Sequence, residues 1–550
     1  MQQQGQLNGQ PVYILPEGTQ RTIGLDAQRQ NIAVIMAVAG AVQSTLGPKG
    51  RDKMLVDSMG DVIITNDGAT ILKQMQVEHP TAKLIVEIAK TQDNEVGDGT
   101  TSAVILAGGL AKKASELLDQ DIHASTIISG YKNAARKTEE LLSASAEEIK
   151  LNDLAALKKV AMISLGSKSV SMGSAKDNLA ELVVQAVTQV VEKRGEKVTV
   201  DKDFIKIEKK QGGNVEETNL IRGVLVDKEI VHPGMPKHIE NPKIALIDTA
   251  LEIEKTEIDA KISITSPDQM EAFLDQEEKM LKTMVEKIAK SGANLVFCQK
   301  GIDDVAQHFL SKKGISVARR VKKSDMEKLS KATGARIITT LDDLSEKDLG
   351  TAGLAEERKI AGENMIFVEK CKEPKAVTLL VRGSTEHIVD EAERAFNDAI
   401  GAVISSIEVG KIVYGGGAIE IEVANQLRKY SAEVGGREQL AIKAFADAPE
   451  SIPKTLAENS GMDIIDSLVD LRAKHEKGEK TLGINVYTAK LEDMKKNGVI
   501  EPLKIKTQAI SSATEVVTLI LRIDDIIAAK SRGPAMPPGG MGGMPGMEGY

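Results

Sequence analysis

The stretch NEVGDGTTSAVILAGGL (residues 94–110) places one acid, Asp98, between two glycines and follows it with two threonines and an apolar run. An ordinary helix start needs one capping oxygen from Ser, Thr, Asp or Asn, so Asp98 and a single glycine would be sufficient. The second glycine exceeds that requirement. The stretch therefore predicts a helix whose start also serves another purpose.

A second stretch, NDGATIL (residues 66–72), repeats the pattern Asp-Gly-x-Thr, with Asp67 in the place of Asp98. Glycine lets a backbone approach a ligand closely, and free N–H groups at a helix N-terminus attract anions, so two such starts predict a cradle for a polyphosphate. Aspartates do not attract phosphate, but Mg²⁺ typically binds one or two carboxylates together with substrate phosphates. The pair therefore indicates a site for Mg²⁺ and a nucleotide. The alternative is that both aspartates are plain N-caps, which is the commoner role of a single Asp-Gly pair.

Two further glycine-rich pieces and one lysine extend this candidate site. TLGPKG (residues 45–50) follows a helical run, where its glycine and proline would also suit an ordinary helix stop. YGGGA (residues 414–418) precedes another helical run, and its three glycines exceed what a cap requires. Lys168, in ISLGSKS, is a further candidate, with a solvated loop lysine as the alternative. The sequence lacks the motif G-x-x-x-x-G-K-[ST], which excludes a P-loop enzyme, and it contains neither H-E-x-x-H nor G-x-S-x-G.

The composition is that of a water-soluble globular protein with several domains. A prior of about 150 residues per domain suggests three or four domains for a chain this long. Hydrophobic residues make up 41% and charged residues 27% of the sequence, and since aromatic residues are only 2%, the core must be aliphatic. The net charge of -9 argues against a nucleic-acid or anionic-membrane partner, because both require a concentrated basic surface.

The ends of the chain and its cysteines favour a cytoplasmic protein. The N-terminal sequence MQQQGQLNGQ has no basic region followed by an apolar one, so no secretory signal is expected. The longest apolar run, residues 32–42, is 11 residues long, whereas a membrane span needs about 20, and we interpret it as a buried helix. Cys298 and Cys371 form no C-x-x-C unit, so we expect two reduced thiols and no zinc site.

Hydrophobic periodicity predicts helices at both ends of the chain and a sheet in the middle. Four short apolar runs alternate with helical stretches and predict an open sheet of the α/β class: residues 244–248, 294–298, 315–321 and 335–339. Long helices are expected at residues 267–290 and from Ser384 or Thr385 to about Ile407. A hairpin is expected at residues 53–65, and the apolar run at residues 515–523 is interpreted as a strand whose edges need partners. The Gly, Pro and Met tail cannot pack a core and should be disordered.

The four glycine-rich motifs, taken together and in this order, resemble the nucleotide site of the chaperonins. Three longer segments are similar to the archaeal and eukaryotic-cytosolic group of that family, the group II chaperonins: residues 436–459, 483–494 and 498–510. The Gly-Met tail favours an archaeal thermosome subunit. The resemblance covers nearly the whole chain.

The resemblance implies a fold that is mainly α with an α/β apical layer, divided into three domains. An equatorial ATPase domain would comprise residues 1–150 and 408–550, and an intermediate domain residues 151–220 and 372–407. An apical domain would comprise residues 221–371, with a helical protrusion at about 248–279 that acts as a built-in lid. Residues 531–550 would be the disordered tail.

The resemblance also implies a role for each motif residue. Asp98 would coordinate Mg²⁺, Asp67 would lie near the γ-phosphate and the attacking water, and Lys168 would sense the γ-phosphate. The base that activates water is an aspartate of the helix that starts near residue 384, where Asp398 matches the family position better than Asp390. Ala395, Ala399 and Ala402 form a small strip beside Asp398 that would let another domain approach. The remaining nucleotide contacts would be Thr45, Leu46, Gly47, Pro48, Gly99, Thr100, Thr101, Gly415, Gly416, Asn485 and Glu501.

The function implied is an ATP-driven folding chamber. Identical or paralogous subunits would form two stacked rings of eight or nine, enclose non-native proteins and need no separate lid protein. No nucleic-acid or membrane partner is expected. One alternative is a structural ring or filament whose nucleotide regulates assembly, and another is a small-molecule kinase or ATPase, against which the low-complexity tail and unpaired strand edges count.

Overall fold

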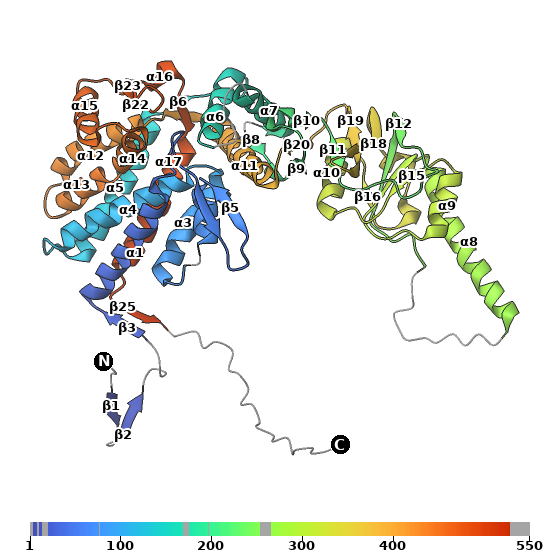
Figure 1. The fold of residues 1–550 in the computed structure, drawn as a ribbon, viewed down its shortest axis with the longest axis horizontal. Helices are drawn as coiled ribbons and strands as arrows, with labels where there is room; N and C mark the ends of the chain where they lie inside the picture. Colours follow the sequence, from blue (N-terminus) through green and yellow to red (C-terminus); the bar gives the residue numbers. More distant parts are fainter. Residues whose placement is uncertain are drawn as a thin grey trace, which may run out of the picture.

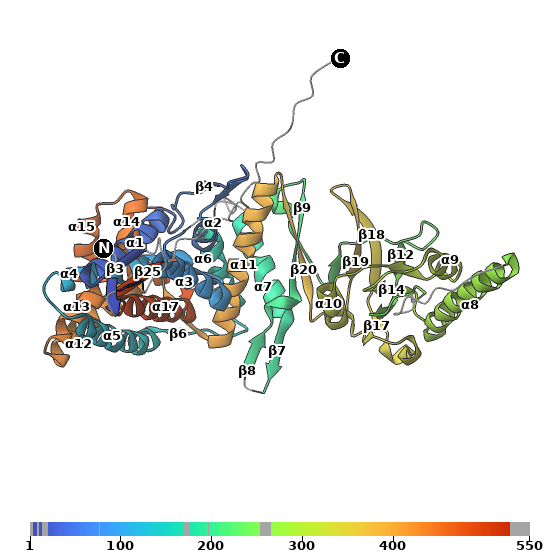
Figure 2. The same cartoon turned by 90° about the horizontal axis from the view of Figure 1, so that it is seen from below.

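The structure is a computed structural model that describes residues 4–7, 10–13, 20–75, 77–168, 175–195, 197–253 and 266–528. The chain is elongated, with a helical body at one end and a sheet-rich body at the other (Figure 1). A segment of helices and strands lies between the two bodies (Figure 2). The prediction of helical ends and a sheet-rich middle is confirmed.

The helical body is assembled from both ends of the chain. Helix α4 (Thr100–Leu118) lies at its centre and is buried along most of its length, because nearly all its residues up to Ala111 are apolar or small. Around it pack α1 (Leu25–Gln43), α3 (Pro80–Val96), α5 (Ala124–Ser145), α13 (Glu438–Asp447) and α17 (Leu503–Leu521). An edge-to-face contact between Tyr131 and Phe445, with ring centroids 5.5 Å apart, joins the N-terminal and C-terminal halves of this core.

The apolar run at residues 515–523 is not a strand, and that prediction is wrong. Most of the run belongs to α17, in which Ala509, Ala513, Val517 and Leu521 recur every four residues and are buried. The β-branched residues that favoured a strand are accommodated because packing against α4 and α5 outweighs their local preference. The edge that we expected to need a partner therefore does not exist there.

Two antiparallel strand pairs lie at the surface of the helical body. The predicted hairpin is confirmed as β4 (Lys53–Val56) and β5 (Val62–Thr65). Strand β3 (Gln20–Ile23) pairs with β25 (Asp525–Ala528), so segments near the two ends of the described chain lie side by side (Figure 1).

The joining segment has its own apolar core. It consists of α6 (Leu154–Gly166), α7 (Ala175–Val190) and α11 (Glu386–Val409), which pack on one another, and a three-stranded sheet of β9 (Ile205–Gln211), β10 (Asn219–Ile221) and β20 (Val377–Gly383), which α7 and α11 contact. The hairpin β7 (Val191–Arg194) and β8 (Lys197–Val200) extends from it. The predicted long helix starts as expected, since the Thr385 side chain caps α11.

The sheet-rich body confirms the predicted open sheet. Four parallel strands stand in the order β15 (Ser316–Ala318), β14 (Leu295–Cys298), β13 (Lys243–Ile247) and β16 (Ile337–Ile338). Helices α8 (Pro267–Ser291), α9 (Asp304–Lys312) and α10 (Lys323–Thr333) accompany the sheet. A second, antiparallel sheet contains β11 (Val224–Val226), β12 (His238–Glu240), β18 (Leu354–Ile360) and β19 (Glu363–Glu369).

Part of the expected protrusion falls outside the described residues. Residues 254–265 are not described, and the rest of the segment includes the first half of α8, whose buried residues begin only at Leu281. The expected disordered tail at residues 531–550 also lies outside the described residues. Within the described part of the chain, no helix combines the length and hydropathy of a membrane span.

Candidate active site

The two glycines around Asp98 serve two different helices. Gly97 ends α3 and Gly99 precedes α4, and both have a φ of 80°, in the left-handed region that side chains other than glycine rarely adopt. The chain thus leaves one helix and enters the next within three residues, with Asp98 at the corner. The second glycine is therefore needed because one glycine ends α3 and the other starts α4.

Asp98 and Asp67 start their helices in different ways. Asp67 is a plain N-cap, since its Oδ2 accepts a hydrogen bond from the Thr70 N–H of α2 (Gly68–Gln74) at 2.8 Å. Asp98 does not cap α4: the N-cap residue is Gly99, which has no side chain, and Asp98 Oδ1 accepts a hydrogen bond from the adjacent Gly99 N–H at 2.6 Å. The capping alternative therefore holds for Asp67 and fails for Asp98. The first turn of α4 keeps N–H groups that no side chain caps, which suits an anion.

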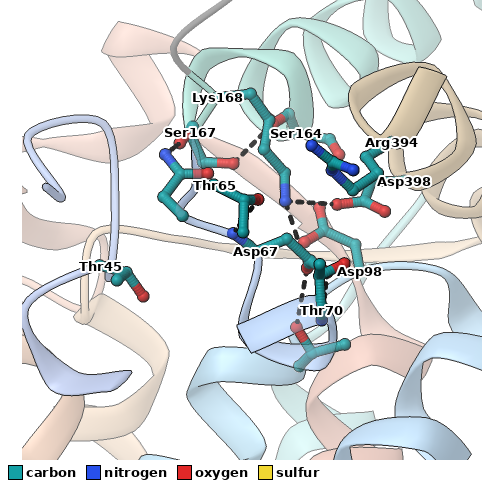
Figure 3. Close-up of polar contacts among 12 residues, drawn as sticks. Thr45, Thr65, Asp67, Thr70, Asp98, Ser164, Ser167, Lys168, Arg394 and Asp398 are labelled. Atoms are coloured by element: carbon teal, nitrogen blue, oxygen red, sulfur yellow. Dashed lines mark hydrogen bonds and ion pairs between the residues drawn. The ribbon is translucent and has the colours of Figure 1, made fainter. Parts of the chain in front are cut away.

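Lys168 joins three elements in a buried charge cluster beside these helix starts (Figure 3). Its Nζ lies 2.8 Å from Asp398 Oδ2 on α11 and 3.4 Å from Asp67 Oδ1, and all three side chains are at most 10% exposed. The alternative of a solvated loop lysine is therefore wrong. Asp390 lies elsewhere on α11, paired with Lys209 at 2.8 Å, so Asp398 is the aspartate of that helix that reaches the cluster.

The charged groups of the cluster shift one another's pKa values. Burial raises the pKa of Asp398 well above its ordinary value, and the charges of Asp67 and Asp98 add to this against the opposing Lys168 ammonium. Burial also raises the pKa of Asp98, although the cavity beside it leaves part of its side chain open to solvent. For Asp67, burial is outweighed by Lys168 and by the hydrogen bonds from Thr70, so its pKa is lowered. Burial lowers the pKa of Lys168, but its two carboxylate partners raise it by more, so the net effect is a raised pKa.

Two cavities meet at Asp98. The larger, of about 490 Å³, has a volume typical of small-molecule sites and lies between the start of α4 and the segments at residues 484–487 and 497–502. The smaller, of about 70 Å³, reaches the charge cluster. Both are lined by Leu46, Gly47, Asp98 and Gly99. The larger is also lined by Pro48, Gly416, Asn485 and Glu501, and the smaller by Thr45, Asp67, Thr100, Thr101 and Lys168.

Two predicted residues line neither cavity. Gly415 lies behind Glu501, since a Cβ at position 415 would be 2.4 Å from Glu501 Oε1. Asp398 is connected to the smaller cavity through Lys168. All the other predicted residues lie on the two cavities, although they come from segments near both ends of the chain.

Known proteins resemble this chain over most of its length. The model of the TCP-1/cpn60 chaperonin family matches residues 38–531. The chain belongs to this family. The chaperonin is 60% identical to a thermosome subunit of Methanopyrus kandleri over 95% of its own length and 96% of the relative's. It is equally identical to thermosome subunit beta of Archaeoglobus fulgidus, over 98% and 99% of the two chains.

A solved structure shares the fold. It is the open-state monomer of a group II chaperonin from Methanococcoides burtonii, 45% identical, with a TM-score of 0.59 over 78% of this chain and all of that one. The expected group II, archaeal thermosome type is thereby confirmed. The protein is an ATP-dependent chaperonin that folds proteins, and it is a subunit of an oligomeric assembly.

The sequence analysis missed several polar residues at the site of the chaperonin. Lys506, on α17, is buried and pairs with Glu420 at 2.8 Å and with Glu501 at 2.6 Å, and it borders the larger cavity. Lys159 and Lys176 line the same cavity, and Asn66 lines the smaller one. Asn66 belongs to the motif at residues 66–72 and Lys506 to the segment at residues 498–510, but no rule of residue spacing marks either of them as a site residue.

Proposed function

We propose that this chaperonin hydrolyses Mg²⁺-ATP where its two cavities meet, and that hydrolysis drives the closing of a chamber around non-native proteins. The observation that carries this proposal is the position of Asp98. It lies between the uncapped start of α4, on the larger cavity, and the Lys168 cluster, on the smaller one. A triphosphate bound through both cavities would bring its terminal phosphate to that cluster.

The uncharged residues divide between the two parts of the nucleotide. Backbone groups of Gly47, Gly99, Thr100 and Thr101 would bind phosphate oxygens, because N–H groups at a helix start point toward an anion. Thr45, Leu46 and Pro48 would form the adjoining wall. Gly415, Gly416, Asn485 and Glu501 would border the nucleoside.

The donor set fits a divalent cation. Three buried or half-buried carboxyls, on Asp67, Asp98 and Asp398, face a single ammonium, so the ionised cluster would carry an excess of two negative charges. No cluster of three His, Cys, Asp or Glu side chains arranged to hold a metal occurs among the described residues. Mg²⁺ can be bound through one carboxylate when phosphates and water supply the other ligands. Asp98 would hold the ion, which when bound neutralises charge on the phosphates.

The remaining charged residues would act on the attacking water. Asp398 would accept its proton, for which a raised pKa is suitable, because a base with a pKa near the working pH is the most effective. Asp67 would lie near the γ-phosphate and the attacking water, and the Lys168 ammonium would stabilise charge that develops on the transferred group. These residues come from the N-cap of α2, from α11 and from the segment just after α6, so the site is complete only when the elements are in contact.

Helix α11 connects this chemistry to the rest of the molecule. It carries Asp398 and packs against α6 and the sheet strand β20, which leads toward the sheet-rich body. A motion that lifted α11 would remove Asp398 from the cluster, and hydrolysis would then depend on conformation, as in other enzymes with a moving element. Three separate apolar cores support the proposed equatorial, intermediate and apical domains, with the boundaries given above.

The assembly proposed is two stacked rings of eight or nine identical or paralogous subunits, in the cytoplasm, with no separate lid protein. The hairpin β4–β5 exposes Met54, Val56 and Met59, which are between 62% and 83% exposed and would be covered by a neighbouring subunit. The two free, buried cysteines suit a reducing compartment.

The experiment that tests the proposal is refolding of a denatured client with ATP. The wild-type particle and an Asp390→Ala control should refold the client, whereas Asp98→Ala should not, and electron micrographs with ATP should show closed double rings. An Asp98→Ala particle with undiminished ATP turnover and refolding would overturn the proposed site. Assembly without any refolding would favour the structural-ring alternative.

A further inference from the structure

Asn66 holds an unused hydrogen-bond acceptor beside the charge cluster. It immediately precedes Asp67, lines the smaller cavity and is 6% exposed. Its amide nitrogen donates a hydrogen bond of 2.7 Å to the Ser167 carbonyl oxygen. Its amide oxygen is buried and has no partner among the residues that the structure describes.

The orientation of this amide is determined by its partner. A carbonyl oxygen only accepts hydrogen bonds, so the nitrogen of Asn66 must face Ser167 and the oxygen must face away from it. A buried acceptor without a donor destabilises a folded protein, and such atoms usually mark a bound water or a functional group. The Asn66 oxygen therefore requires a donor that the described part of the chain does not supply.

The chemistry of the cavity limits what this donor is. Carboxylate and phosphate oxygens accept hydrogen bonds when ionised, so neither the ionised aspartates nor the phosphates of ATP satisfy the Asn66 oxygen. The hydroxyl of Thr45 donates to the Val42 carbonyl, and the Lys168 ammonium is held by two carboxylates. A water molecule has two hydrogens and would donate one to Asn66 and the other to a carboxylate.

We propose that the Asn66 side-chain oxygen positions the water that attacks ATP, an inference that rests on the proposed function of this site. With one hydrogen on Asn66 and the other on Asp398, the lone pairs of the water are turned toward the γ-phosphate. The water oxygen forms a bond to the γ-phosphorus, its proton passes to the Asp398 carboxylate, and the bond to the β–γ bridging oxygen breaks. The products are ADP and phosphate.

The hydrogen bond to Ser167 gives Asn66 a second effect. Ser167 directly precedes Lys168, so the same side chain that holds the water also tethers the backbone next to the lysine of the cluster. Asn66 is thus a water-positioning residue whose place depends on the segment after α6.

The test compares two analogues of the bound γ-phosphate on the assembled particle. ADP with beryllium fluoride mimics the ground state and needs no attacking water, whereas ADP with aluminium fluoride mimics the transition state. For Asn66→Leu we expect kcat to fall at least tenfold and aluminium fluoride binding to weaken by a similar factor, with beryllium fluoride binding unchanged. Equal weakening of both analogues, or an unchanged kcat, would overturn the proposal.

Three controls complete the design. Asn66→Ala carries the same comparison if the leucine variant fails to assemble. Asn425→Leu removes another buried amide, which accepts from Arg428 and lines neither cavity, and should leave the ratio of the two analogues unchanged. If Asp98→Ala loses nucleotide binding while Asn66→Leu keeps a normal kcat and normal binding of both analogues, the role of Asn66 is rejected and the proposed site stands. Normal binding and turnover in Asp98→Ala would reject the proposed site as a whole.

Discussion

The Lys168 ammonium lies 2.8 Å from a carboxylate oxygen of Asp398, and this ion pair joins the segment just after α6 to the middle of α11 inside the protein. Burying two charges is costly unless each has a partner, and breaking such a pair by removing one member is therefore strongly destabilising. Here a second carboxylate, Asp67, shares the same ammonium. The pair is thus both a structural tie and a part of the proposed catalytic cluster.

Removing the proposed base should separate binding from hydrolysis. For Asp398→Ala we expect kcat to fall by about 10²–10⁴-fold, the usual contribution of a positioned acid or base, with little change in nucleotide affinity. Phosphate release and calorimetric titration with ADP measure the two quantities. Asp390→Ala, which affects only a half-exposed pair with Lys209 on the same helix, is the matched control. A comparable loss of kcat in both variants would contradict the assignment.

Removing the proposed metal ligand should change the Mg²⁺ requirement. For Asp98→Asn we expect the Mg²⁺ concentration that gives half-maximal ATPase activity to rise at least tenfold, because the substituted amide is a weaker ligand than a carboxylate. The affinity for ADP without Mg²⁺ should not fall, since the mutation also removes a negative charge near the phosphates. A Mg²⁺ titration curve equal to that of the wild type would show that Asp98 does not hold the ion.

The pH dependence of turnover should report the raised pKa of Asp398. A base must be deprotonated to act, so kcat should rise with pH as Asp398 loses its proton, above the range of an ordinary aspartate. The Lys168 ammonium lowers this pKa, so in Lys168→Met the rise in residual activity should move to a higher pH. Single-turnover rates between pH 5 and 9 measure both profiles. A shift to lower pH in the variant would contradict this electrostatic argument.

Because α3 and α11 approach closely at Gly97, an alanine at this position should lower kcat. A Cβ at Gly97 would be 3.0 Å from Gly401 Cα, one turn beyond Asp398, so Gly97→Ala should push α11 away and lower kcat several-fold. Gly478 also has a positive φ, of 97°, but has open space around it. Gly478→Ala should therefore lower thermal stability by about 1 kcal/mol through backbone strain alone, without the loss of kcat.

The two cysteines should be unreactive in the folded particle. Burial raises the pKa of both Cys298 and Cys371 to about 11. Only about one thiol in a thousand would then be ionised at pH 8, and the thiolate is the reactive form. Labelling with a chromogenic disulfide reagent at pH 8 should be slow in the native protein and rapid in guanidinium chloride. Fast labelling of native protein would show that these segments open.

Local patterns were sufficient for much of the fold. Short apolar runs between helical stretches predicted the four parallel strands, and the Thr385 cap with its following apolar periodicity predicted the start of α11, because both signals depend on a few neighbouring residues. The same reasoning failed at residues 515–523, where a continuous apolar run suits a buried strand and a buried helix equally. Packing against α4 and α5 decides between them, and the run itself contains no information about those helices.

The sequence by itself determined that two Asp-Gly-x-Thr helix starts exist, and the order of its glycine motifs pointed to the chaperonins. Only the tertiary structure decided that Asp67 caps its helix while Asp98 faces a cavity, that Asp398 and not Asp390 meets Lys168, and that Lys168 is buried. The physical reason is one of range. A helix start depends on a few adjacent residues, whereas burial, ion pairing and the pKa of a carboxyl depend on groups that only folding brings together from distant parts of the chain.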